Sequence, residues 1–98
     1  MPVYVIAQLW FTDEARYRAY QAEFPEVFAR SGGRVLAADE APTLLEGDWT
    51  GSKVVLLEFP DEPRARAFLE GPEYQRISLD RRAGAKTVAL LVHAPPGA

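Results

Sequence analysis

Four apolar runs along the chain predict four β-strands. They span residues 3–10, 34–39, 53–59 and 86–93, and each contains β-branched side chains, which favour strands. Gln8 interrupts the first run, and Glu58 and His93 stand near the ends of the third and fourth. The stretches between these runs have a different periodicity and predict helices and turns.

A helix is predicted between the first two runs because apolar residues recur there at three- and four-residue spacing. This stripe consists of Tyr17, Tyr20, Phe24 and Val27 or Phe28. Thr12 or Asp13 can cap the start of the helix. Pro25 predicts a kink or break within it, because proline has no N–H and clashes with the preceding turn. Ser31-Gly32-Gly33 predicts its end, since glycine readily adopts the left-handed conformation.

The segment between the second and third runs predicts an interrupted strand and a turn. Ala41-Pro42 breaks the second strand, which residues 43–46 are expected to continue beyond a bulge. Residues 47–52 are rich in turn formers, and Gly47 is expected to take a positive φ.

After the third run, two prolines predict two helix starts. Residues 60–63 open a helix whose inward residues are Ala65, Phe68 and Leu69, and Gly71 ends it. Pro72 starts a second short helix, expected to end near Leu79. Residues 82–85 then predict a turn before the last strand.

A sequence repeat supports a fold made of two similar halves. Residues 11–20 and 59–68 share Phe, Asp, Glu, two Arg and one Ala at matching positions, each at a strand-to-helix corner. The alternative is that Asp-Glu with alternating Arg simply starts a helix well twice. Either way, the element order is βαββαβ, which predicts an α+β, ferredoxin-like fold. Right-handed crossovers then give a four-stranded antiparallel sheet of order 4-1-3-2, with the helices on one face.

The predicted strands lack the alternation of apolar and polar residues that is expected of a sheet covered on one face only. Residues 3–7, 54–57 and 88–92 are apolar on both faces, and no spare element remains to cover the second face. At strand spacings of ~4.8 Å, that face measures about 400 Å² in projection. We therefore expect a homodimer whose two sheets face each other as a barrel.

Length and charge narrow the class of protein. The 98 residues predict a single domain over 1–98, with a flexible tail at 94–98. The net charge of −3 argues against a nucleic-acid partner. Without cysteine the chain offers no disulfide and no thiolate site. No apolar run approaches a membrane span and the N-terminus does not resemble a signal peptide, so the predicted location is cytoplasmic.

Two polar residues in apolar strands are candidates for catalysis. Glu58 closes an apolar run, and a desolvated carboxylate there would act as a general base; the alternative is an ion pair with Arg81 or Arg34. His93 is the only histidine, so one chain cannot form a histidine cluster for a metal. Three roles are open for His93: a hydrogen-bonded surface residue, an acid–base catalyst or a haem ligand. The sheet order should bring both residues and Tyr4 to one end.

Candidate ligand-binding residues complete the set. Gln8 and Trp10 should lie at the other end of the sheet, near Glu46 and Trp49, where Trp49 can instead pack at the dimer seam. Tyr74 can direct its hydroxyl into a cleft or pack in the core. Arg81 can hold an anion or cap its helix. The complete set of candidate binding residues is Gln8, Glu46, Trp49, Tyr74 and Arg81.

Five short motifs resemble the family called domain of unknown function 1330. They are Gly32-Gly-Arg34, Glu46-Gly-Asp-Trp49, Glu58-Phe-Pro60, Gly71-Pro-Glu-Tyr-Gln75 and Arg81. The resemblance implies a ferredoxin-like protomer of the dimeric α/β-barrel superfamily, and no established reaction. Members of the superfamily include cofactor-free monooxygenases, isomerases and haem-binding dismutases, so the fold by itself is a weak guide to function.

Two functions follow as hypotheses. The first is a small structural or ligand-binding dimer with an apolar cleft, because no nucleophile, metal or cofactor motif is present. The second is a cofactor-independent enzyme, using proton transfer or monooxygenase- or isomerase-like chemistry on a small apolar or aromatic molecule. In neither is a cofactor or metal expected.

Overall fold

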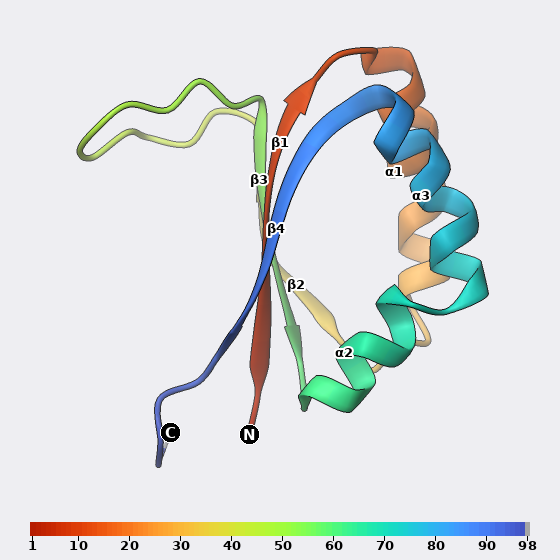
Figure 1. Ribbon diagram of the computed structural model, residues 1–98, viewed down its shortest axis with the longest axis vertical. Helices are drawn as coiled ribbons and strands as arrows, with labels where there is room; N and C mark the ends of the chain where they lie inside the picture. The colour runs from red at the N-terminus through yellow and green to blue at the C-terminus, as the bar shows by residue number, and fades with distance from the viewer. Residues whose placement is uncertain (98) are drawn as a thin grey trace.

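The computed structural model describes residues 1–97 and contains four strands and three helices. The strands are β1 (Val3–Phe11), β2 (Arg34–Asp39), β3 (Lys53–Phe59) and β4 (Ala85–His93). The helices are α1 (Glu14–Phe28), α2 (Glu62–Leu69) and α3 (Pro72–Gly84). The strands form one antiparallel sheet of order β2-β3-β1-β4, the order predicted from the sequence. All helices lie on one side of it (Figure 1). The fold is α+β and ferredoxin-like, as predicted.

The sequence repeat marks two equivalent helix starts. Asp13 and Asp61 cap α1 and α2 by accepting hydrogen bonds from the backbone N–H groups three residues later, at 3.3 and 2.9 Å. The glutamate after each aspartate forms an ion pair with the arginine four residues on, in the pairs Glu14–Arg18 and Glu62–Arg66. The matching residues therefore perform the same local task in both halves.

Register assigns each strand residue to one of two faces. On the inner face, toward the helices, Val3, Val5 and Leu9 alternate along β1, opposite Phe59, Leu57 and Lys53 of β3. The outer face carries Ile6, Leu56, Val88, Leu90 and Val92. Among the described residues no helix covers the outer face, and Leu90 is 51% exposed. Figure 1 shows the long segment between β2 and β3 extending on this side.

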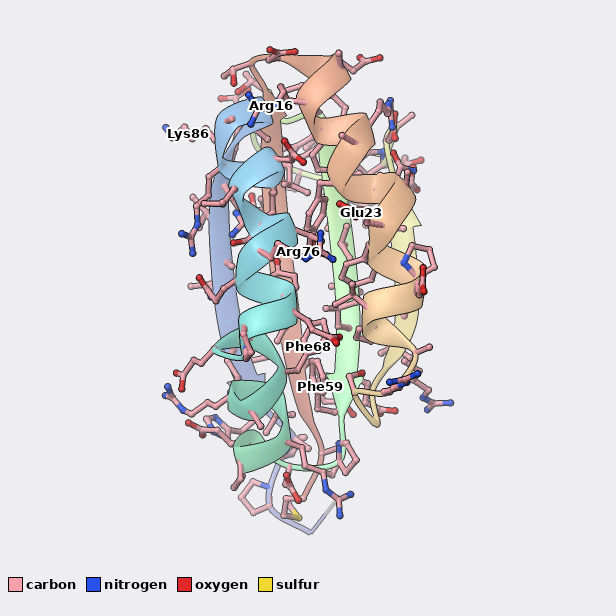
Figure 2. All side chains as sticks on the ribbon, turned by 90° about the vertical axis from the view of Figure 1, so that its right-hand side faces the viewer. Arg16, Glu23, Phe59, Phe68, Arg76 and Lys86 are labelled. Carbon is pink, nitrogen blue, oxygen red and sulfur yellow. The ribbon has the colours of Figure 1, made fainter. Side chains whose placement is uncertain are left out.

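Two aromatic-rich clusters join the helices to the inner face. One contains Phe28, Phe59 and Ala65, and the other contains Tyr17, Tyr74 and Ile77. Figure 2 shows α1 alongside the α2–α3 segment above the strands, with Phe59 and Phe68 at one end. It also shows Arg76 of α3 and Glu23 of α1, whose ion pair of 3.1 Å links the two helices.

Pro25 does not break α1, contrary to the prediction. The helix continues to Phe28, and the N–H of Ala29 still bonds to the Pro25 carbonyl at 3.0 Å. The proline itself is exposed, whereas Phe24 and Phe28 on either side pack into the core, and their rings lie 4.9 Å apart. Burial of these aromatic rings offsets the lost hydrogen bond. The predicted positive φ of Gly47 is confirmed, at 87°.

Two further boundary predictions were wrong. Residues 43–46 form no strand, and the bulge in β2 lies between Val35 and Ala37. Residues 82–85 form no turn, because α3 continues to Gly84. The N–H groups of Thr12 and Asp13 both donate to the Gly84 carbonyl, at 2.9 and 3.0 Å. The residues before α1 therefore supply hydrogen bonds to a carbonyl at the end of α3 that has no partner within its own helix.

The first residue of the predicted flexible tail, Ala94, is held against the start of the chain. Ala94 is 9% exposed, and its N–H bonds to the Pro2 carbonyl at 3.2 Å, which holds it beside the first residues of the chain. Of the remaining tail, Ala98 lies outside the described residues.

Gly84→Ala should lower the free energy of unfolding by roughly 1–3 kcal/mol, because it overpacks the α1–α3 contact. A Cβ at Gly84 would meet the backbone of Tyr17 and lie 2.8 Å from the Asp13 carbonyl oxygen. Without such a clash, a Gly-to-Ala change stabilises by about 0.4–1 kcal/mol. Urea denaturation followed by circular dichroism measures the sign. Ala83→Ser, an exposed helix position, is the control, and a stabilised Gly84→Ala variant would contradict the close packing.

Candidate functional site

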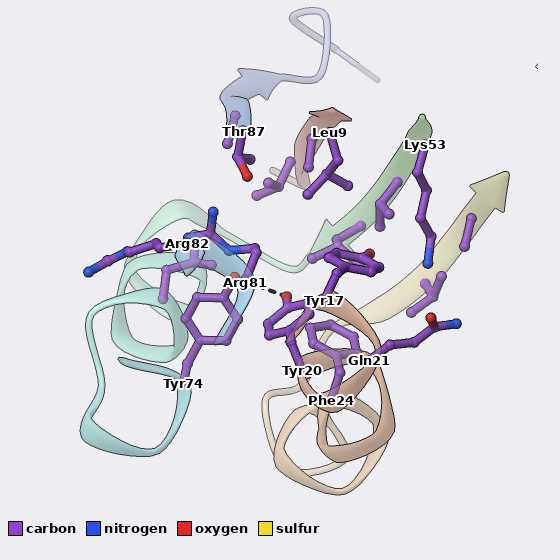
Figure 3. Close-up of a pocket in the computed structure, with 18 of the residues that line it drawn as sticks. Leu9, Tyr17, Tyr20, Gln21, Phe24, Lys53, Tyr74, Arg81, Arg82 and Thr87 are labelled. Carbon is purple, nitrogen blue, oxygen red and sulfur yellow. Dashed lines mark hydrogen bonds between the residues drawn. The ribbon is translucent and has the colours of Figure 1, made fainter. Parts of the chain in front are cut away.

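A cavity of about 340 Å³ lies between the inner face of the sheet and the helices. Its walls are mainly apolar, and α1 and α3 contribute Tyr20, Phe24 and Tyr74 (Figure 3). The sheet contributes Ala7 and Ala89, which are directly opposed on β1 and β4. These two small side chains in the middle of the sheet, with bulky aromatic clusters on the helices, leave space that larger residues would fill.

Two tyrosines close the floor of the cavity. The hydroxyl oxygens of Tyr20 and Tyr74 lie 3.1 Å apart and share a hydrogen bond. Burial, with the neighbouring Tyr74, raises the pKa of Tyr20. Burial, followed by the charge of Glu40, raises the pKa of Tyr17 from 10.0 to about 12. The hydroxyls of Tyr17 and Tyr20 are therefore protonated near neutral pH, and they contribute no negative charge to the cavity.

The side of the cavity formed by α3 and β4 holds two polar atoms without partners. Arg81 Nε and Thr87 Oγ1 are buried, and neither has a hydrogen-bond partner among residues 1–97. Both residues line the cavity, and Figure 3 draws them with Arg82 on this side. Buried polar groups are nearly always hydrogen-bonded, so these two atoms mark a place where a bound molecule could supply an acceptor.

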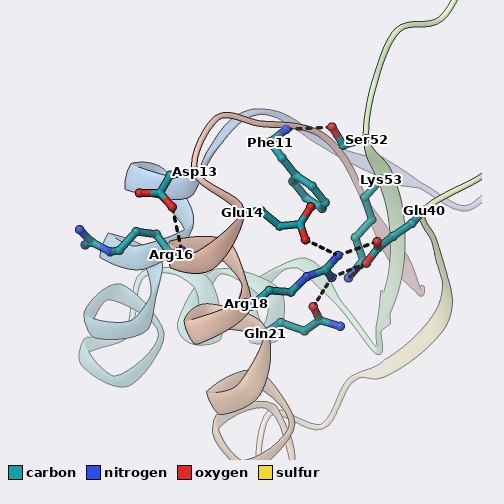
Figure 4. Close-up of polar contacts among 9 residues, drawn as sticks. All are labelled: Phe11, Asp13, Glu14, Arg16, Arg18, Gln21, Glu40, Ser52 and Lys53. Atoms are coloured by element: carbon teal, nitrogen blue, oxygen red, sulfur yellow. Dashed lines mark hydrogen bonds and ion pairs between the residues drawn. The ribbon is translucent and has the colours of Figure 1, made fainter.

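Across the cavity, Lys53 is part of a charged network. Its side chain is 7% exposed, and Nζ lies 3.8 Å from Glu40 and 5.1 Å from the Tyr17 ring centroid. Arg18 donates to Glu40 through both terminal nitrogens (Figure 4), with Nη2 to Oε1 at 2.8 Å. Burial lowers the pKa of the Lys53 ammonium, partly opposed by Glu40, while the hydrogen bond from Arg18 lowers the pKa of Glu40.

The two predicted catalytic residues lie outside this cavity. The register brings Tyr4, Glu58 and His93 to one end of the sheet, as predicted, but Glu58 is on the outer face and His93 is not. Glu58 pairs with Arg34, the second of the two arginines considered. His93 Nε2 lies 2.8 Å from Glu62 Oε1 at the start of α2. Their catalytic roles stay predictions.

The predicted ligand-binding residues lie in three separate places. Tyr74 and Arg81 line the cavity. Gln8 and Trp49 meet on the outer face, where Trp49 Nε1 donates to Gln8 Oε1 at 3.2 Å. The ring centroids of Trp10 and Trp49 lie 6.5 Å apart. Glu46 is exposed in the segment between β2 and β3. Contact of any of these residues with a ligand stays a prediction.

Sequence reasoning did not single out Lys53 or Thr87 as site residues. Lys53 had one recognisable signal, because it shares the inner face of β3 with Leu57 and Phe59 at two-residue spacing. A charged residue on that face is costly to bury without a functional or structural partner. Thr87 carried no such signal, since threonine is common in strands.

Among residues 1–97, no group of three or more His, Cys, Asp or Glu side chains is arranged to hold a metal ion. None of the helices described in this range has the length and apolar content that a membrane crossing requires.

Residues 2–95 match the family described as "Domain of unknown function (DUF1330)". The chain belongs to this family. This confirms the resemblance seen in its motifs, and the family description carries no activity. No curated protein matches the chain.

Solved structures of similar fold include proteins with and without known activity. A protein of unknown function from Rhodopseudomonas palustris is 19% identical, with a TM-score of 0.79 and coverage of 97% of this chain and 84% of its own. SnoaB, a cofactor-independent oxygenase from Streptomyces nogalater, is 20% identical, with a TM-score of 0.67 and coverage of 96% and 93%. A dimeric ferredoxin-like protein of unknown function from Thermobifida fusca is 13% identical, with a TM-score of 0.68 and coverage of 96% and 92%. At these identities the likeness establishes the shared fold.

Raising the pH from 10 to 12 should destabilise the protein through Tyr17. The unfolded chain releases this proton near its ordinary pKa of 10.0, whereas the folded protein holds it to about 12. The stabilisation is therefore complete below pH 10 and is lost as pH rises toward 12, on the order of 2 kcal/mol.

Chemical denaturation at several pH values measures this loss in wild type and in Tyr17→Phe. The variant should lose less stability over the same interval, and tyrosinate absorbance should show one high-pH titration fewer. Equal losses in the two proteins would contradict the assignment to Tyr17.

Proposed function

We propose that this protein is a homodimer that binds a small apolar or aromatic molecule in the cavity between its sheet and helices. The observation that carries the proposal is the cavity of about 340 Å³, whose lining is mainly apolar with a few polar groups. Small-molecule sites typically have volumes of roughly 300–1,000 Å³ and this mixture of groups. A structural protein without a ligand would gain stability by filling such a space.

The polar groups around the cavity also favour binding over simple imperfect packing. Lys53 of β3 and Arg81 of α3 both line the cavity, and Figure 3 draws them on opposite sides of Tyr17. Placing a lysine and an arginine beside an apolar space has a desolvation cost, which a ligand that fits both the apolar walls and the charges would offset.

A cofactor-independent enzyme is the second candidate function, and Lys53 is the observation that favours it. Burial lowers the pKa of its ammonium, so the neutral amine, which can accept a proton from an acidic ligand, becomes more accessible. The fold shared with SnoaB, a cofactor-independent oxygenase, is compatible with this chemistry. Glu58 and His93 would serve it only through a site other than the cavity.

The outer face of the sheet supports the homodimer. Val88, Leu90 and Val92 of β4 are 37–51% exposed on this face, and the segment between β2 and β3 adds Leu45, which is 93% exposed. A second copy of the same face is the simplest cover for such a surface. The dimeric state given for the Thermobifida fusca protein, which has a similar fold, also supports it.

Ala7→Phe should weaken binding of Nile red, a neutral apolar dye, in the cavity. The new ring would occupy the space opposite Ala89 in the middle of the sheet. Wild type should give saturable fluorescence enhancement, with the affinity reduced roughly tenfold or more in the variant. Ala22→Phe, on the exposed side of α1, is the control and should bind as wild type does.

Failure of wild type to bind the dye, or equal binding by folded Ala7→Phe, would contradict a cavity site. Mass spectrometry of probes recovered after incubation separates the two candidate functions, because an enzyme changes its ligand and a binding protein returns it unaltered.

Leu90→Asp should weaken the dimer by roughly tenfold or more, because it places a charge in the proposed apolar interface. Leu79→Asp is the matched control, since Leu79 is 61% exposed on α3, away from the sheet face, and Leu90 is 51% exposed. Sedimentation velocity over a dilution series measures the effect. A wild type that is monomeric at micromolar concentration, or equal behaviour of the two variants, would contradict the proposed interface.

A further inference from the structure

We propose that the ligand bound in the cavity carries an anionic oxygen, such as a carboxylate or phenolate, and that Arg81 with Thr87 binds this group. The inference rests on the proposed function of the cavity as a binding site. It specifies the chemistry of the ligand: an apolar or aromatic body with an oxyanion at the side formed by α3 and β4.

The first argument is hydrogen bonding. Arg81 Nε carries a hydrogen and can only donate, and it has no acceptor within residues 1–97. Thr87 Oγ1 can donate as well, and it too is buried without a partner. A buried donor left unpaired is costly, so two of them lining one cavity favour an acceptor from outside the chain. A carboxylate offers two oxygens, which suits an arginine particularly well.

The second argument is charge. Arg81 takes part in none of the ion pairs found in the described part of the chain. The neighbouring carboxylate of Asp80 binds Arg16 at 2.8 Å, and Arg82 donates to Gln75 at 3.1 Å. The α3 side of the cavity therefore has a guanidinium charge without a counter-ion.

The other groups at the cavity do not remove this imbalance. Lys53 is balanced by Glu40, 3.8 Å away on the opposite side. Tyr20 and Tyr74 share one hydrogen bond, in which one hydroxyl donates and the other accepts, and neither carries a charge that would balance Arg81. The cavity therefore lacks a negative group, which the ligand would supply. With this group bound at Arg81, the apolar part of the ligand would lie against residues such as Leu9, Phe24 and Val55.

The test compares two probes that share an aromatic body. Naphthoate carries a carboxylate, whereas naphthylmethanol is neutral and of similar size. Isothermal titration at neutral pH should show wild type binding naphthoate at least tenfold more tightly, as expected for charge-assisted hydrogen bonds.

Three variants locate the anion. Arg81→Met should weaken naphthoate binding about tenfold to a hundredfold and change naphthylmethanol binding less than threefold. Thr87→Val should weaken naphthoate binding by a smaller factor. Arg76→Met removes one positive charge from the same helix at a residue that does not line the cavity, so it should bind both probes as wild type does. Thermal denaturation verifies that each variant is folded.

The outcomes separate this inference from the proposed function. If wild type binds both probes equally, or if Arg81→Met leaves naphthoate binding unchanged, the oxyanion site is wrong and the cavity site stands. An equal loss in Arg76→Met would mean general charge attraction and would also overturn the inference. If wild type binds neither probe nor Nile red, both the inference and the proposed function are overturned.

Discussion

A sheet that is apolar on both faces is the constraint on which the rest of this structure depends. Within residues 1–97, three helices are available to cover the four strands, and all three lie on one side. Apolar surface is driven out of water wherever it occurs, so the inner face must bind the helices and the outer face requires another cover. The inner cavity and the proposed dimer interface are therefore two consequences of the same strand composition.

The inner face is closed at its ends more tightly than in its middle. Phe28, Phe59 and Phe68 pack together at one end, while Gly84 allows α3 to meet the start of α1 at the other. Between them, Ala7 and Ala89 are too small to fill the space under the helices. The protein thus maintains a cavity without a disordered core, because each end is fixed independently by its own contacts.

The charges on the two sides of the cavity differ. Lys53 is paired with Glu40, which Arg18 binds in turn, whereas Arg81 across the cavity has no carboxylate partner among residues 1–97. A symmetrical apolar cavity would accept a molecule in many orientations. For the proposed ligand, this arrangement predicts one orientation, with its negative group at the side formed by α3 and β4.

The paired helix starts followed from the sequence because they depend on local chemistry, the Asp-Glu-x-Arg-x-Arg repeat. The strand order followed from the order of the elements and the right-handedness of the crossovers. The length of α3 and the continuity of α1 through Pro25 could not be predicted, since contacts with distant residues outweigh local preference there. The candidate site residues were also predicted only in part. Glu58 stood out because a carboxylate in an apolar run is locally unusual, yet its partner Arg34 is on the neighbouring strand. The sequence determined the order of the elements and the apolar composition of the strands, because both depend on local pattern. Only the tertiary structure decided that Lys53, Arg81 and Thr87 surround one cavity, because their proximity arises from packing between elements far apart in the chain.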